Sequence, residues 1–172
     1  MLRTLLTGLI MLVCFLLQTS IFPMLLPIEV YPNLFIIITC TCGFMMEETP
    51  GLIVGFLCGL SYDVFFGDVV GFHALLYMYI GYLNGKFSRI FYPEDIKLPL
   101  ALITVSDLTY SLISYILTFL VRGKLDFPYY FLHIILPEMI CTLVATLIFY
   151  PPILKMNEWL RKRERRSEQH FV

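Results

Sequence analysis

The sequence has little charge: 15% of its 172 residues are charged, whereas 59% are hydrophobic. The mean hydropathy is +0.81. A water-soluble domain needs more polar surface than this, so the composition excludes that class. Apolar runs of roughly 20 residues, the length that crosses a bilayer as a helix, recur along the chain. They lack the period-two alternation of transmembrane β-strands. We therefore predict an all-α integral membrane protein.

The sequence also lacks the motifs of common enzyme classes. Its five cysteines lie inside apolar runs, and no histidines or further cysteines accompany them at metal-ligand spacing. No nucleophile stands beside an activating base, and no glycine-rich loop could cradle a phosphate. We therefore predict a protein that is not an enzyme, with no catalytic residues, no metal, no cofactor and no nucleic-acid partner. Buried reduced thiols are the expected state of the cysteines.

Six apolar stretches predict a bundle of six transmembrane helices. Prolines, glycines and short polar segments separate them. The tail is too short to form a second domain, so we expect one membrane domain over residues 1–155 and a basic tail over 156–172. The expected helices are Arg3–Phe22, Pro32–Met46, Pro50–Phe66, Phe72–Phe87, Leu98–Val121 and Pro128–Leu154, the last bent near Pro137 and Pro151.

The positive charges are distributed asymmetrically between the two ends of this bundle. An even number of crossings puts both termini on one side, and ten of the 12 lysines and arginines then fall on that side. Only Arg122 and Lys124 fall on the other. Cytoplasmic segments carry the excess of Lys and Arg, so both termini are predicted to be cytoplasmic.

Small residues recur every four positions along the third expected helix. Gly51, Gly55, Gly59, Asp63 and Gly67 form one ridge that drifts by about 40° per step. Glycines at this spacing allow another helix backbone to approach closely. We expect the ridge to contact a helix, either of the same chain or of a partner.

The turn after this ridge brings two carboxylates and a histidine together. Asp63 is expected to face protein or water rather than lipid, while Asp68 in GDVVG is an ordinary turn residue. His73 opens the next helix and is placed to bond to Asp63 or Asp68, which favours helix capping over a proton relay. Asp63 and Asp68 superficially resemble an intramembrane aspartyl protease pair. On one helix, however, they are about 140° apart, so the resemblance is accidental.

Three further polar residues lie within the expected spans. Asn84 belongs to a second small-residue segment, GYLNG. Asp107 is near the middle of its helix, on one face with Tyr110, Ser111 and Ser114, and Glu138 follows Pro137. Charges at this depth are costly, so we expect intramembrane or partner contacts from His73, Asn84, Asp107 and Glu138. Struts between helices and a cavity for a ligand or proton both remain open.

The tail combines one tryptophan with a run of charges. This pattern predicts an anchor to anionic lipid or to a cytoplasmic partner. The residues of this anchor are Trp159, Arg161, Lys162, Arg163, Arg165 and Arg166.

The sequence resembles the family of the bacterial rod shape-determining protein MreD. The residues that carry this are the opening Pro32-Asn33-Leu34 and the block GLIVGFLCGLSYDVFFGDVVGFHALLYMYIGYLNGKF from Gly51 to Phe87. The chain length, the cytoplasmic termini and the basic tail agree with the family as well.

The resemblance implies a non-enzymatic subunit of the rod (elongation) complex, in the bacterial cytoplasmic (inner) membrane. Its expected partner is MreC, whose transmembrane helix the Gly51–Gly67 ridge would grip. MreB, a SEDS glycosyltransferase and a class B penicillin-binding protein are further direct or indirect partners in side-wall peptidoglycan synthesis, and a homodimer is left open. The fold is similar to the substrate-binding subunits of energy-coupling-factor vitamin transporters, which supplies the alternative function.

Overall fold

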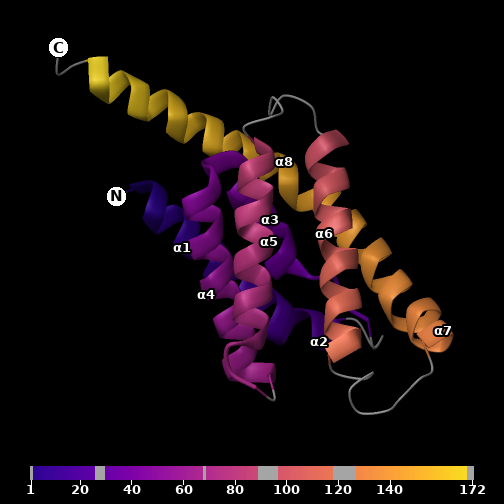
Figure 1. Ribbon diagram of the computed structural model, residues 1–172. Helices are drawn as coiled ribbons and strands as arrows, with labels where there is room; N and C mark the ends of the chain where they lie inside the picture. The colour runs from indigo at the N-terminus through magenta and orange to yellow at the C-terminus, as the bar shows by residue number, and fades with distance from the viewer. Residues whose placement is uncertain (1, 26–29, 68, 89–96, 118–126, 170–172) are drawn as a thin grey trace.

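The computed structural model describes residues 2–25, 30–67, 69–88, 97–117 and 127–169, and the regular structure in these ranges is entirely helical (Figure 1). The helices are α1 (Leu2–Leu16), α2 (Phe22–Leu25), α3 (Leu34–Met46), α4 (Glu48–Phe66), α5 (Phe72–Ser88), α6 (Lys97–Tyr115), α7 (Phe127–Tyr130) and α8 (Leu136–Gln169). A π-helical turn joins α1 to α2, and another, Phe131–Ile135, joins α7 to α8. The chain therefore belongs to the predicted all-α class.

The joined helices make six continuous helical segments, one for each predicted helix. Four of them are long and apolar enough to cross a membrane: Arg3–Ile21, Glu48–Phe66, Lys97–Tyr115 and Phe127–Arg163. α3 is shorter, with 13 residues, and rises only about 20 Å, whereas the hydrocarbon core of a bilayer is about 30 Å thick. The six crossings and their orientation stay predictions.

The starts of α3 and α4 each lie two residues from the approximate positions that the sequence predicts. α3 begins at Leu34, not Pro32, because the Asn33 side chain caps it by accepting a hydrogen bond from the Ile36 amide at 3.2 Å. α4 begins at Glu48, two residues before Pro50, because Glu47 has φ +79° and breaks the helix after Met46. The predicted end of the fifth helix at Val121 lies outside the described residues.

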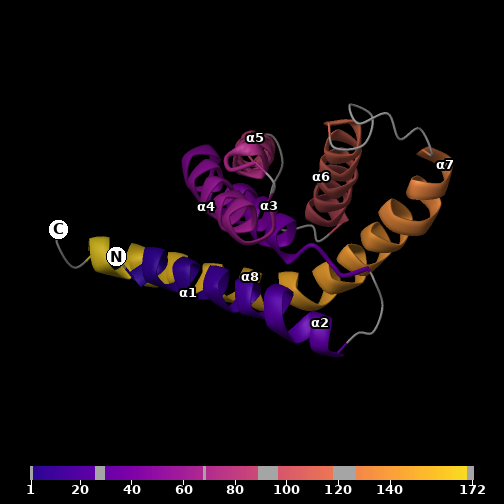
Figure 2. The ribbon, with the colours of Figure 1, turned by 90° about the horizontal axis from the view of Figure 1, so that it is seen from below.

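α3 lies at the centre of the structure. Every residue from Leu34 to Met45 is buried, so this helix is surrounded by protein and not by lipid. α4 and α5 pack on one side of α3, and α1 and α8 on the other, while α6 contacts α3 and α8 (Figure 2). An apolar helix with no polar face is the expected sequence for such a position.

The first part of the predicted tail is helical, because α8 continues without interruption through Pro151 and Pro152 to Gln169. The division into a membrane domain and a cytoplasmic tail stays a prediction. The helix changes direction between its α7 end and its C-terminal end, as expected of a helix with internal prolines (Figure 2). Arg3 donates to Asn157 at 3.1 Å, and Arg161 donates to the Met45 carbonyl oxygen at the end of α3. The start of α1 and the C-terminal part of α8 therefore meet at one end of the bundle.

Candidate functional site

The small-residue ridge of α4 packs directly against the backbone of α5. A Cβ atom at Gly51 would lie 2.6 Å from the Gly81 carbonyl oxygen, and one at Gly59 would lie 2.5 Å from the Ala74 Cα. Gly55 faces the Tyr77 carbonyl in the same way. Real Cβ atoms do not approach this closely, so α4 and α5 can be in contact only because these positions are glycines.

The predicted grip of this ridge on a partner helix is therefore wrong. α5 of the same chain occupies the ridge, and a second helix cannot enter without displacing it. Gly67 has a different role, since its N–H donates to the Asp63 carbonyl oxygen at 3.0 Å and ends α4. Of the two readings that the sequence left open, the structure shows the intramolecular one.

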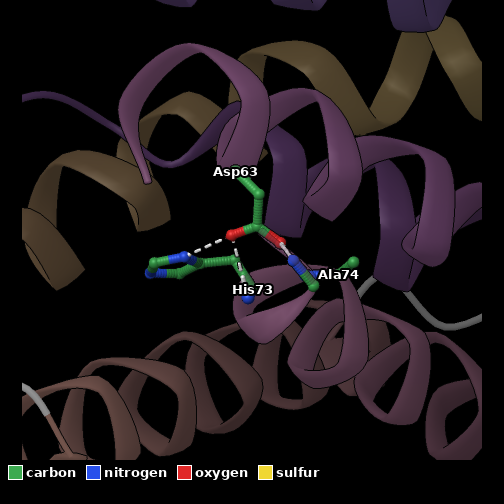
Figure 3. Close-up of polar contacts among 4 residues, drawn as sticks. Asp63, His73 and Ala74 are labelled. Atoms are coloured by element: carbon green, nitrogen blue, oxygen red, sulfur yellow. Dashed lines mark hydrogen bonds and ion pairs between the residues drawn. The ribbon is translucent and has the colours of Figure 1, made fainter. Parts of the chain in front are cut away.

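Asp63, near the end of the ridge, caps the N-terminal end of α5. Its carboxylate is buried and accepts the backbone N–H groups of Gly71, His73 and Ala74 at 2.8, 3.0 and 2.9 Å (Figure 3). These are donors that the first turn of a helix leaves unpaired. A carboxylate at this end also interacts favourably with the helix dipole. Gly71, with φ +102°, turns the chain so that these donors converge on one side chain.

His73 adds a fourth donor to the same carboxylate. Its Nδ1 lies 2.7 Å from Asp63 Oδ1, so the predicted bond between these residues is confirmed. A carboxylate accepts only, so Nδ1 carries the hydrogen. The imidazole packs against the rings of Tyr62 and Tyr110, and within the described residues no serine, threonine or cysteine bonds to it. The pair therefore caps the N-terminal end of α5. Asp68 lies outside the described residues.

A second buried network ties the start of α3 to α5 and α8. Asn33 Oδ1 accepts the Tyr77 hydroxyl at 2.9 Å, and the Asn33 N–H donates to the Thr142 hydroxyl at 3.1 Å. Thr142 in turn donates to the Glu138 carbonyl oxygen at 2.9 Å. No sequence pattern predicts Tyr77 and Thr142 as polar contacts. An asparagine before an apolar run is a helix-start signal, but nothing in the sequence shows which distant residues meet it.

Asn84 is a strut between two helices. It is buried, and its amide nitrogen donates to the Ile80 carbonyl oxygen and to the Ser106 hydroxyl of α6, both at 2.9 Å. Its carbonyl oxygen has no partner. This side chain holds α5 against α6, and its burial leaves it out of reach of a partner protein.

Asp107 differs from every other acidic residue that the structure describes in the bundle. It is 1% exposed, and neither carboxylate oxygen has a hydrogen-bond partner. Thr142 lies beside it, and its rotatable hydroxyl hydrogen can turn either to this carboxyl group or to the Glu138 carbonyl oxygen, 2.9 Å away. The half-buried Glu138 side chain is close enough to Asp107 for their charges to interact. The two predicted intramembrane carboxylates thus belong to α6 and α8, which pack against each other.

The basic residues of α8 have unequal roles. Arg161 donates to the Met45 carbonyl oxygen at 2.6 Å and so caps the C-terminal end of α3, where a cation is favoured. The Arg163 guanidinium lies over the Trp159 ring, 5.3 Å from its centroid. Lys162 is exposed, and the side chains of Arg165 and Arg166 lie outside the described residues. Arg161 therefore serves the fold in addition to any anchoring role.

Comparison with known proteins identifies a family. Residues 1–160 match the family described as rod shape-determining protein MreD, which is nearly the whole chain. No curated protein and no solved structure matches it.

Proposed function

Because the chain belongs to the family of the rod shape-determining protein MreD, we propose that it is a non-enzymatic scaffold of the bacterial cell-elongation complex. In this role it spans the cytoplasmic membrane with both termini inside and holds the transmembrane helix of MreC. It thereby supports cell shape and side-wall peptidoglycan synthesis. The family match over residues 1–160 is the observation that carries the proposal.

The use of the polar residues supports a scaffold. Asp63, Asn33 and Asn84 all hold one helix of the chain to another. Such contacts fix the arrangement of the helices relative to one another. A rigid bundle of this kind suits a subunit that positions other membrane proteins.

The exposed face of α1 is the surface that we assign to MreC. α1 is the least buried of the four long apolar helices. Leu5, Leu9, Leu12 and Leu16 are 47–72% exposed and follow the spacing of a helix-pairing seam. Gly8 lies beside this row, and a Cβ atom there would meet nothing within 4 Å. A second helix can therefore approach the α1 backbone closely at Gly8, as it cannot at the filled ridge of α4.

Site-specific photocrosslinking tests this assignment. Photoreactive residues at Leu5, Leu9 and Leu12 of α1 should crosslink to MreC in membranes that contain both proteins. Leu75 and Leu83 of α5 are similarly exposed, at 52% and 49%, and serve as matched controls. Crosslinks from α5 and none from α1 would overturn the choice of surface. Failure of the unmodified protein to co-purify with MreC would overturn the proposed function itself.

The alternative, a vitamin-binding transporter subunit, requires an outward pocket with aromatic walls. Aromatic side chains of α4, α5 and α6 pack on one another instead. The ring centroids of Tyr62 and His73 are 4.6 Å apart, and those of Tyr77 and Tyr110 are 4.9 Å apart. We therefore retain the scaffold as the proposed function.

A further inference from the structure

Two hydrogen bonds fix the level at which α8 would leave a membrane. Arg3, at the start of the first apolar span, donates to Asn157 at 3.1 Å. Arg161 donates to the Met45 carbonyl oxygen at the end of α3 at 2.6 Å. Arginine side chains near helix ends reach for the border between the hydrocarbon core and the lipid headgroups. Residues 157–161 of α8 therefore lie at this border, and the helix continues past the other helices, away from the bundle (Figure 1).

One face of α8 at this level carries three basic side chains and the single tryptophan of the chain. Asn157 and Leu160 are buried, at 4% and 2% exposed, so they turn the opposite face of the helix to the bundle. The four exposed residues lie within about 100° of one another around the helix axis. We call them the basic stripe, and they are Lys155, Trp159, Lys162 and Arg163.

The cations of the basic stripe have no anionic partner within the described residues. Glu158 is exposed and comes four residues before Lys162, a spacing that favours an ion pair on a helix, but the two side chains form none. The Arg163 guanidinium lies over the Trp159 ring, 5.3 Å from its centroid. This contact uses the face of the guanidinium, while its N–H donors lie in the plane of the group and stay available. Phosphate oxygens are the acceptors that such donors match.

We propose that the basic stripe binds the headgroups of anionic phospholipids in the leaflet at this end of the bundle. Tryptophan prefers the headgroup level, where its ring is partly in apolar surroundings and its N–H is in contact with water. The hydrogen bonds of Asn157 and Arg161 hold the stripe at that level, which favours a lipid over a soluble protein as its ligand. Arg161 is not part of the stripe, because its guanidinium reaches Met45. The inference concerns a lipid and not MreC, so its failure would leave the proposed function untouched.

Fluorescence of the single tryptophan tests the proposal on the unmodified full-length protein. The protein is placed in bilayers of phosphatidylglycerol and phosphatidylcholine, with bromine, which quenches tryptophan, on the acyl chains of one lipid at a time. Brominated phosphatidylglycerol should quench Trp159 more than its share of the bilayer predicts, and added salt should reduce this excess. Quenching in proportion to composition would overturn the proposal. No quenching by either lipid would place Trp159 outside the bilayer, which would reject the lipid in favour of a soluble protein ligand.

Substitutions in the same assay locate the lipid. Lys162→Gln and Arg163→Gln should each lower the preference for phosphatidylglycerol by up to about fivefold, the effect of one basic group beside an anionic surface. Glu158→Gln removes a negative charge next to the stripe and should raise the preference. Lys97→Gln removes an exposed cation at the start of α6, at the same end of the bundle, and is the matched control that should behave like wild type (Figure 1). An equal loss in Lys97→Gln would show that the total charge of the protein attracts the lipid, and would overturn the site.

Discussion

The cap on α5 predicts a large effect of a minimal substitution, Asp63→Asn. The carboxylate accepts four hydrogen bonds, two at each oxygen. Asparagine has one acceptor oxygen, and its NH₂ group would point hydrogens at two of the four donors. With the NH₂ group turned towards Gly71 and Ala74, two bonds to a charged acceptor are lost. With it turned towards His73, the backbone N–H bond of His73 is lost, and the Nδ1 contact survives only if the imidazole changes tautomer.

The size of the effect follows from the lost bonds. Each hydrogen bond to a charged group contributes about 1.5–3 kcal/mol, so the loss of one or two of them should lower the free energy of unfolding by about 1.5–6 kcal/mol. The favourable charge at the helix N-terminus adds about 0.3–1 kcal/mol to the loss. The total is a large part of the roughly 5–15 kcal/mol that stabilises a typical domain. Asp63→Asn should therefore be poorly stable although its shape is almost unchanged.

Unfolding by SDS in mixed micelles, followed by far-ultraviolet circular dichroism, measures this loss. Glu158→Gln makes the same chemical change at an exposed carboxylate and should shift the free energy by no more than about 0.5 kcal/mol. His73→Ala removes one of the four donors, so its cost should be smaller than that of Asp63→Asn. A loss below about 1 kcal/mol for Asp63→Asn would contradict this prediction and would mean that the backbone donors had found other partners.

Four other substitutions test the remaining contacts. Gly55→Leu should prevent accumulation of the protein in membranes, measured by immunoblot. The new side chain would overlap the Tyr77 backbone, and the loss of stability should exceed the roughly 1–3 kcal/mol of ordinary overpacking. Gly8→Leu is the control and should accumulate normally, because a Cβ atom at Gly8 meets nothing within 4 Å. Tyr77→Phe removes the hydroxyl that bonds to the α3 cap and should lower the unfolding free energy by about 0.5–1.5 kcal/mol in the SDS assay. Arg161→Met should lower it by about 1.5–3 kcal/mol, because a charged donor to the α3 carboxyl end is lost. Glu47→Gly should instead raise the thermal midpoint, since the present backbone conformation costs about 1–3 kcal/mol for a residue with a Cβ.

Local patterns predicted the helices and one of the polar contacts. The apolar runs fixed the number of helical segments, because an 18–20-residue run has few alternatives in a membrane. The Asp63–His73 contact was predictable, since a short turn must bring residues ten apart together. The start of α4 was not predictable, because a positive φ is rare for glutamate and no sequence pattern announces it at Glu47.

Long-range pairing was not predictable from the same patterns. A small-residue ridge has the same sequence pattern whether it packs against α5 or against a helix of another protein. The sequence therefore could not show which helix Gly51 and Gly59 contact. Asn33 bonds to Tyr77, 44 residues away, and to Thr142, 109 residues away. Contacts of this kind depend on how complete helices pack against one another, and the periodicity of a single sequence does not encode that packing.

Burial alone does not decide how much a carboxylate contributes to stability. Asp63 meets four donors, so removal of its charge should cost stability. Asp107 is equally buried, but no comparable set of donors converges on its oxygens. In the SDS assay, Asp63→Asn should therefore lower the free energy of unfolding much more than Asp107→Asn, although the chemical change is the same at both positions.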